Sequence, residues 1–182
     1  QGVKELILVA QETTMYGIDL YGEKTLPQLL RELCKINTLQ WVRILYCYPE
    51  EITPELVQVM KEEKKICHYL DLPIQHANDE ILKRMGRKMT KQQLKDTIYM
   101  LRREIPDICL RTTLITGFPG ETAKQHEEVM TFIDEMEFDR LGVFTYSAEE
   151  DTAAARMPDQ IEEEQKEDWQ DELMELQQEI SY

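Results

Sequence analysis

Short apolar runs alternate with amphipathic segments along the whole chain. The apolar runs have the composition of buried strands and cover residues 4–10, 41–48, 66–75, 109–116 and 140–147. The segments between them carry apolar residues at helical spacing, which predicts helices over residues 25–36, 53–63, 78–85, 90–104 and 122–136. Strands that alternate with helices in this way predict an α/β fold with a parallel sheet. The pattern leaves two architectures open, a partial or complete (β/α) barrel and an open doubly wound sheet.

Helix start signals support three of these helices. Thr25 with Gln28, and Thr122 with Gln125, have the spacing of a capping box, in which two side chains bond to backbone N–H groups at the helix start. Thr53 stands directly before a proline, the usual order of an N-cap and a first helical residue. We therefore expect a helix to begin after each of these three threonines.

A last amphipathic segment covers residues 160–182. Side chains that form one stripe recur there every three or four positions, at Ile161, Gln165, Trp169, Leu173, Leu176 and Ile180. This spacing predicts one helix whose stripe docks on the rest of the molecule. We expect residues 1–158 to form the α/β body and residues 159–182 to form an exit helix.

Composition and charge narrow the class of protein. The 182 residues are 42% hydrophobic and 31% charged, which suits a globular domain with a core, and no apolar run approaches the roughly 20 residues that span a bilayer. Residues 147–182 hold 13 acidic and 2 basic side chains, and they carry most of the net charge of −15. Binding of nucleic acid through phosphates is therefore disfavoured. The acidic segment is either a solvated helix face or a surface that attracts a basic protein.

The cysteines do not have the spacing of a metal site. Cys34, Cys47, Cys67 and Cys109 form no Cys-x-x-Cys pair, and no histidine stands at a zinc-ligand spacing from them. We expect reduced thiols of a cytoplasmic protein and no metal site within these residues.

Polar residues and glycines follow several predicted strands at their carboxyl ends. They are Gln11 and Glu12 after the first strand, Gln75 and His76 after the third, and Gly117, Gly120 and Glu121 after the fourth. The carboxyl ends of parallel strands meet at one edge of a sheet, so these residues predict a site for a small ligand. Arg111 and Thr113 share one face of the fourth strand, where the guanidinium can bind a carboxylate. His76 is either a ligand contact or a hydrogen-bonded structural histidine.

Five stretches resemble the radical S-adenosylmethionine methylthiotransferases, in order and across essentially the whole chain. They read AQETTMYGIDLYG, WVRILYCYP, YLDLPIQHANDEILKRMGR, LRTTLITGFPGET and FDRLGVFTYSAEEDTAAARM. The details are most similar to the branch that modifies an aspartate of the twelfth small-subunit ribosomal protein, because tRNA-modifying relatives usually read GQNVNSYG, TSHP and LPVQSGS at the matching places. Asp151 stands where relatives commonly have glycine, which is a departure from the family at the local turn.

The resemblance implies a partial (β/α) barrel of which this chain supplies units two to six. It also implies S-adenosylmethionine and a [4Fe-4S] cluster at the carboxyl rim, and transfer of a methylthio group to the β-carbon of the aspartate. The family binds this cluster through a Cys-x-x-x-Cys-x-x-Cys motif that these residues lack. We therefore expect the first barrel unit, the cluster ligands and a carboxyl-terminal TRAM module to lie outside the chain, which alone would be inactive.

The resemblance also implies which residues bind the cofactor. The implied set is Gln11 and Glu12 near the methionine amino group, Gln75 and His76 near the ribose, Arg111 at the methionine carboxylate, Gly117 and Gly120 where the backbone approaches the adenosine, and Thr113, Phe118, Phe144 and Tyr146 around it. Two alternatives stay open. One is a tRNA methylthiotransferase of the same superfamily, and the other is a non-catalytic α/β scaffold that binds a small molecule or a partner.

Overall fold

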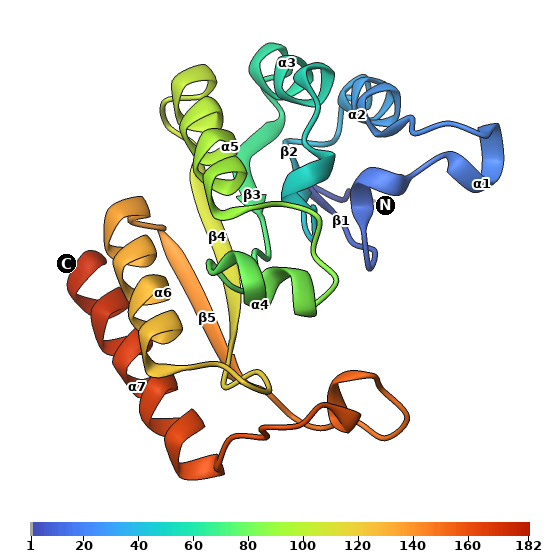
Figure 1. Cartoon of the computed structure of the whole chain (residues 1–182). Helices are drawn as coiled ribbons and strands as arrows, with labels where there is room; N and C mark the ends of the chain where they lie inside the picture. The colour runs from blue at the N-terminus through green and yellow to red at the C-terminus, as the bar shows by residue number, and fades with distance from the viewer. Residues whose placement is uncertain (1) are drawn as a thin grey trace. The chain divides into compact units, whose positions relative to one another are not determined.

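Parallel strands and helices alternate through the part of the chain that the computed structural model describes, residues 2–182 (Figure 1). The strands in that range are β1 (Glu5–Leu8), β2 (Trp41–Ile44), β3 (Ile66–Asp71), β4 (Cys109–Thr116) and β5 (Arg140–Thr145). They form one sheet in the order β1-β2-β3-β4-β5, and the β1–β2, β2–β3 and β3–β4 pairs are parallel. The prediction of an α/β fold with a parallel sheet is confirmed.

The helices lie where the sequence pattern predicts them. They are α1 (Ile18–Tyr21), α2 (Leu26–Cys34), α3 (Pro54–Glu62), α4 (Asp79–Arg84), α5 (Lys91–Glu104), α6 (Ala123–Met136) and α7 (Glu163–Ile180), with single 3-10 turns at Thr13–Met15, Pro49–Glu51 and Ala154–Arg156. Helix α1 and the 3-10 turns were not predicted. Each is three or four residues long, too short for a spacing of apolar residues to mark it.

All three predicted helix starts are confirmed, and two of the three threonines make the predicted capping bond. The Thr53 hydroxyl accepts the Leu56 N–H at the start of α3, and Thr122 forms the complete capping box at the start of α6. The capping box predicted at Thr25 is wrong, because the Thr25 side chain makes no capping bond. Its intended partner Gln28 instead donates from Nε2 to the carboxylate of Glu55 on α3 at 3.1 Å.

The first of two compact units comprises the described residues up to Pro73 together with Asp96–Arg111. It holds β1, β2 and β3 with α2, α3 and most of α5. Its core consists of fully buried apolar side chains, including those of Leu30, Val42, Ile44, Met60, Leu70 and Leu101. Strand β1 is only half covered, since Ile7 remains 48% exposed.

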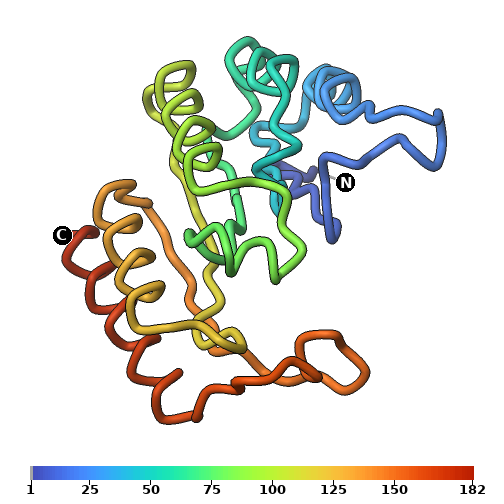
Figure 2. The backbone as a smooth tube through the Cα atoms, in the orientation of Figure 1, coloured from blue at the N-terminus to red at the C-terminus, as the bar shows by residue number. Residues whose placement is uncertain are grey.

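The second unit comprises Ile74–Lys95 and Thr112–Tyr182. Helix α7 runs beside α6, as the red and orange segments of Figure 2 show, and it also packs on β5. Side chains from all three elements and from the α6–β5 connection form the core, including those of Val129, Phe132, Ile133, Phe138, Val143, Trp169 and Leu173. The predicted docking of the terminal helix is therefore confirmed.

The buried face of α7 is shifted from the predicted stripe. Lys166 and Gln177 are buried beside Trp169 and Leu173, whereas Gln165 is exposed. The two polar side chains are buried because each donates to a backbone carbonyl, Lys166 to that of Tyr146 and Gln177 to that of Phe138. Their long apolar stems complete the packing of the helix.

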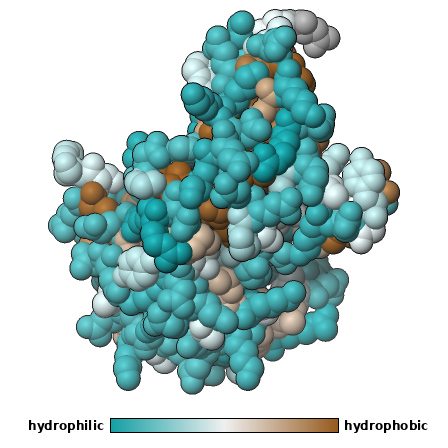
Figure 3. Space-filling view, turned by 90° about the horizontal axis from the view of Figure 1, so that it is seen from above, coloured by the Kyte–Doolittle hydropathy of each residue, from teal (hydrophilic) through white to brown (hydrophobic). Residues whose placement is uncertain are grey.

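No helix within residues 2–182 is long and apolar enough to cross a membrane. Hydrophilic side chains cover most of the face seen in Figure 3, with hydrophobic side chains in smaller groups between them.

Candidate functional site

Strand β4 supplies the central wall of the candidate site. Its side chains alternate strictly, so that Leu110, Thr112, Leu114 and Thr116 are buried on one face. Arg111, Thr113 and Ile115 lie on the opposite, partly exposed face. This alternation confirms that Arg111 and Thr113 share a face, and it directs both side chains away from the helix-covered core.

Two adjoining hollows of about 450 and 380 Å³ lie in the second unit. Both are lined by Gln75, Ile115, Tyr146 and Ala154. The larger hollow adds, among others, Thr113 and Phe144, and the smaller adds Phe118 and Met157. Five of the residues singled out from the sequence therefore line these hollows, namely Gln75, Thr113, Phe118, Phe144 and Tyr146.

Two buried polar atoms at these hollows have no hydrogen-bond partner within the described residues. They are Oε1 of Gln75 and the hydroxyl oxygen of Tyr146. An unpaired buried polar atom costs about 1–3 kcal/mol, so such atoms in a native structure call for an explanation. A ligand with hydrogen-bonding groups would pair them. The surrounding apolar and aromatic side chains suit a flat heterocycle such as a nucleobase.

The backbone of Gln75 is held in an unfavourable conformation. Its φ of 71° lies in the left-handed region, which is costly for a residue with a long side chain. The conformation is kept because Gln75 bonds to β4 on both sides, donating to Thr113 O at 2.9 Å and accepting from Ile115 N at 2.8 Å. Strain of this kind clusters at ligand sites. Here it fixes the position from which the Gln75 side chain reaches the hollows.

His76 lies next to Gln75 but is turned into the protein. Its ring is 1% exposed, Nε2 lies 2.9 Å from Oε1 of Glu121, and Nδ1 accepts the Asn78 N–H at 3.0 Å. Because Nδ1 is an acceptor, the proton of the neutral ring is at Nε2 and is donated to Glu121. Both ring nitrogens are thus engaged, and His76 supports the loop that carries Gln75.

Glu121 fixes the turn that follows β4. Its Oε2 accepts the N–H groups of Gly117 at 2.8 Å and Phe118 at 3.1 Å, while Oε1 faces His76. The Glu121 N–H closes the turn on Phe118 O at 2.9 Å, and the central Pro-Gly pair has the left-handed glycine of a type II turn. This carboxylate therefore sets the position of Phe118 at the smaller hollow.

Gly117 and Gly120 lack side chains at points where other side chains of the protein pack closely against the backbone. A Cβ at Gly117 would lie 2.2 Å from Cγ of Lys166, and a Cβ at Gly120 would lie 2.5 Å from a guanidinium nitrogen of Arg84. Both glycines also have positive φ, 74° and 77°. Glycine is required at these positions by the turn and by internal packing.

Glu12 and Gln11 belong to the first unit. The Glu12 carboxylate accepts the N–H of Thr14 at 2.9 Å and the N–H of Tyr48 at 2.8 Å, as well as the Thr14 hydroxyl. It therefore connects the loop after β1 to the loop after β2. Gln11 is exposed beside it.

Arg111 is paired with a carboxylate that was not singled out from the sequence. Its Nη1 lies 2.7 Å from Oδ1 of Asp71, and Asp71 is 2% exposed. The other oxygen of Asp71 accepts the Tyr46 N–H at 3.3 Å. The Arg111 side chain keeps about a third of its surface, 35%, exposed. It can therefore reach solvent while Asp71 fixes its direction.

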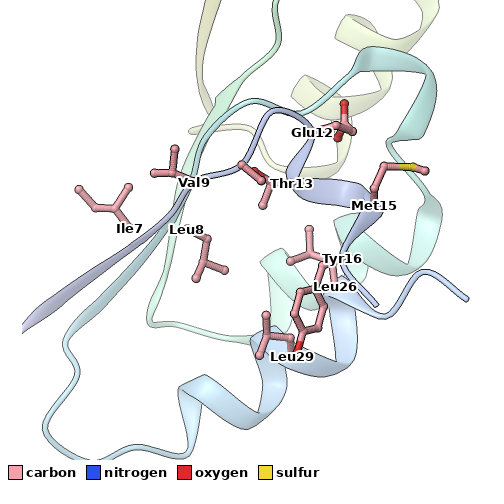
Figure 4. Close-up of a pocket in the computed structure, with 10 residues that line it drawn as sticks. Ile7, Leu8, Val9, Glu12, Thr13, Met15, Tyr16, Leu26 and Leu29 are labelled. Atoms are coloured by element: carbon pink, nitrogen blue, oxygen red, sulfur yellow. The ribbon is translucent and has the colours of Figure 1, made fainter. Parts of the chain in front are cut away.

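An apolar groove of about 490 Å³ lies beside β1 in the first unit. Leu8, Tyr16, Leu26 and Leu29 point toward one another across it (Figure 4). Glu12 stands at its rim, but this carboxylate is engaged by backbone donors. The groove thus differs from the hollows of the second unit, which carry unpaired polar atoms.

Residues 2–182 contain no cluster of three or more His, Cys, Asp or Glu side chains that could hold a metal ion. All four cysteines are free thiols. Cys47 is fully buried, and this burial, together with the charges of Glu12 and Asp71, raises the pKa of its thiol well above the usual range.

Sequence reasoning missed two residues that shape the site, Asp71 and Lys166, and the pairing of Glu121 with His76. Asp71 ends a strand and showed no spacing to Arg111, so only the pairing of β3 with β4 brings the two together. Glu121 was noted after the turn, but its partner His76 is 45 positions away. Lys166 stands three positions before Trp169, a helical spacing that could have placed it on the buried face.

Comparison with known proteins identifies the family. Residues 1–133 match the model of the radical SAM superfamily. The chain belongs to the radical SAM superfamily. It is 64% identical over 181 residues to the ribosomal protein uS12 methylthiotransferase RimO of Lachnoclostridium phytofermentans, and 56% identical to the protein of the same name from Clostridium botulinum. All of this chain is covered in both comparisons, but it spans only 41% of the length of those relatives.

Solved structures, one of them of a radical SAM enzyme, share the fold at low sequence identity. Coproporphyrinogen III oxidase (HemN) from Escherichia coli aligns with a TM-score of 0.69 at 22% identity, over 85% of this chain and 36% of the enzyme. Elp3 from the archaeon Methanocaldococcus infernus aligns with a TM-score of 0.65 at 16% identity, over 95% of this chain and 44% of Elp3. These likenesses confirm the radical SAM fold.

Proposed function

We propose that this chain is the central part of a methylthiotransferase that modifies an aspartate of the small-subunit ribosomal protein uS12. The observation that carries the proposal is the 64% identity, over the whole chain, to a relative named as a uS12 methylthiotransferase. Because the chain spans 41% of that relative, we assign the activity to the longer protein that contains it.

S-adenosylmethionine is the proposed small-molecule ligand, and its adenosine part is assigned to the two hollows of the second unit. Support comes from the unpaired Oε1 of Gln75 and the unpaired hydroxyl of Tyr146, which suit the polar edges of a nucleoside. Phe118 and Phe144 would cover its faces and exclude water. Together with a [4Fe-4S] cluster, the bound cofactor supplies radical chemistry.

The amino-acid end of the cofactor needs charged partners. We assign its carboxylate to Arg111, whose guanidinium is directed by Asp71, and its amino group to the loop of Gln11 and Glu12. We propose that the ligands of the cluster lie outside this chain, because its four cysteines do not have the Cys-x-x-x-Cys-x-x-Cys spacing of the family.

The residues of this chain act by positioning in the proposed mechanism. Gln75 and Tyr146 orient the nucleoside, and Thr113 adds a hydroxyl on the same face of β4. His76 and Glu121 hold the turn that carries Phe118. Holding the reacting groups in one geometry is itself a large contribution to rate, and none of these residues is required as an acid or a base.

The proposed partner is a basic protein in the cytoplasm. The 13 acidic side chains within residues 147–182 would repel the phosphates of RNA and attract a basic ribosomal protein. At physiological salt the Debye length is about 8 Å, so these charges would act mainly on the rate of encounter.

Mass spectrometry of a strain that lacks the gene tests the proposal. We expect the aspartate of uS12 to lose its methylthio group while the methylthio groups of tRNA remain. Loss from tRNA with uS12 still modified would assign the protein to the tRNA branch. No change in either molecule would contradict a methylthiotransferase function altogether.

A further inference from the structure

Lys166 is a buried cation at the amino-terminal end of α7. The residue is 4% exposed, although lysine is almost never fully buried without a partner. Its Nζ donates to the backbone oxygen of Tyr146 at 2.9 Å and to the carboxylate of Glu163 at 2.5 Å. The same nitrogen lies 5.6 Å from the centre of the Tyr146 ring, within cation–π range.

The stem of Lys166 packs on the turn after β4. Its Cγ occupies the place that a side chain at residue 117 would take, 2.2 Å from the position of a Cβ at Gly117. Gly117 is held on its N–H by Glu121, so the turn is fixed by the carboxylate and by the lysine stem. The next residue, Phe118, lines the smaller hollow.

Lys166 therefore contacts Tyr146 directly, and it contacts Gly117, the residue next to Phe118. The ring of Phe118 meets the ring of Tyr146 edge-on, with 5.4 Å between ring centres. The Tyr146 N–H is bonded to Thr116 O at 2.8 Å, so the lysine takes the remaining backbone group of Tyr146. Removal of the ammonium group would free the carbonyl and let both rings shift.

We propose that Lys166 is a positioning residue that couples the docking of α7 to the ligand hollow formed by Phe118 and Tyr146. This inference rests on the proposed function in one respect, that the hollow holds the adenosine of S-adenosylmethionine. Lys166 does not touch the ligand in this scheme. It acts by fixing the two aromatic side chains that do.

The chain offers a matched control on the same helix. Gln177 is also buried, 5% exposed, and it donates from Nε2 to Phe138 O at 2.8 Å. Lys166→Met and Gln177→Met each replace a long buried donor with an unbranched apolar side chain. Each variant loses one hydrogen bond to a backbone carbonyl near an end of β5, that of Tyr146 or that of Phe138. Of the two, only the lysine contacts a residue that lines the hollow, Tyr146.

The first measurement is binding of S-adenosylhomocysteine by calorimetry to the natural full-length protein and its variants. We expect Lys166→Met to raise the dissociation constant roughly tenfold, because Phe118 and Tyr146 would no longer be held in place before the ligand binds, and Gln177→Met to leave it within about twofold. Lys166→Arg keeps a charged donor and should recover part of the affinity. Equal affinity of wild type and Lys166→Met would overturn the positioning role.

The second measurement needs no ligand. 4-Fluorophenylalanine labelling of the same full-length protein gives ¹⁹F signals, and substitution of Phe118 or of Phe138 assigns the signal of each residue. We expect Lys166→Met to move the Phe118 signal and Gln177→Met to move that of Phe138. A wild type that fails to bind the probe, with Phe118 still moved by Lys166→Met, would contradict the ligand assignment alone. An unmoved Phe118 signal in Lys166→Met and Lys166→Arg would overturn the coupling.

Discussion

His76 and Glu121 form a buried hydrogen-bonded pair in which Nε2 lies 2.9 Å from Oε1 and each side chain is 1% exposed. The pair joins the loop after β3 to the turn after β4 within the second unit. Both ring nitrogens of His76 are hydrogen-bonded. The Glu121 carboxylate also accepts hydrogen bonds from two backbone N–H groups. The pair thereby fixes Gln75 on one side of the ligand hollows and Phe118 on another.

Glu121→Gln is predicted to destabilise the protein by about 3 kcal/mol, because glutamine has only one oxygen, so its NH₂ must face either the Nε2–H of His76 or the N–H groups of Gly117 and Phe118 in a buried site. The free energy of unfolding, measured with urea, checks this value. Asp107→Asn is the matched control, since Asp107 also bonds to a histidine, His68, at 2.7 Å but is 75% exposed. That variant should lose no more than about 1 kcal/mol. Equal losses in both variants would contradict the assigned proton position.

Gln75→Gly is predicted to raise the free energy of unfolding relative to Gln75→Ala by about 1 kcal/mol, because only glycine adopts a φ of 71° without strain. Both variants remove the unpaired Oε1 and should weaken binding of S-adenosylhomocysteine. Stability would then distinguish the two variants, whereas both would show the same loss of affinity. Urea unfolding and calorimetry of the same samples measure the two effects. A glycine variant less stable than the alanine variant would show that Gln75 is unstrained.

The fold was predictable because its signals are local. Each strand is a short apolar run and each long helix has a regular spacing, so the order of elements follows from the sequence alone. Thr122 and Gln125 form their capping box for the same reason, since both partners lie within one turn. Thr25 shows the limit of local signals. The predicted partner of Thr25, Gln28, instead donates a hydrogen bond to Glu55 on another helix. No local sequence pattern indicates this contact.

The site was predictable only in part. Position at a strand end and resemblance to the family indicated Gln75, Thr113, Phe118, Phe144 and Tyr146, and these residues do line the hollows. The supporting contacts were not predictable, because they join residues far apart in sequence. Lys166 reaches Tyr146 across 20 positions. The helical spacing from Lys166 to Trp169 indicates the buried face, but no pattern in the chain indicates the carbonyl and the glycine that Lys166 contacts there.

Thr122→Val and Thr25→Val are predicted to differ, although both threonines precede a helix. The Thr122 hydroxyl accepts the Gln125 N–H, so its removal should cost about 1 kcal/mol. The Thr25 hydroxyl is buried and has no hydrogen-bond partner among the described residues. Its replacement by an isosteric methyl group should therefore be neutral or stabilising. Urea unfolding of both variants measures the two changes in the free energy of unfolding. An equal loss of stability in both variants would indicate that the Thr25 hydroxyl caps its helix.

Cys47 is predicted to make the protein less stable at alkaline pH. Burial raises the pKa of its thiol in the folded state, with smaller contributions from the charges of Glu12 and Asp71. Below the ordinary thiol pKa of about 8.5 both states keep the proton, and stability does not depend on this group. Above that value the unfolded state releases the proton while the folded state retains it. The free energy of unfolding should therefore fall as pH rises, by about 2 kcal/mol from pH 8 to pH 10 for this one group.

Cys47→Ala isolates this contribution when each variant is compared with itself at the two pH values. The alanine variant starts less stable, because a fully buried side chain has been shortened, but it should lose less stability between pH 8 and pH 10 than the wild type. Cys67→Ala is the comparison, since burial also raises the pKa of Cys67, although this residue is partly exposed. Its effect on the pH dependence should be the smaller of the two. If Cys47→Ala loses as much stability as the wild type over this range, the thiol of Cys47 is not protonated more tightly in the folded state, and burial beside Glu12 and Asp71 does not control it.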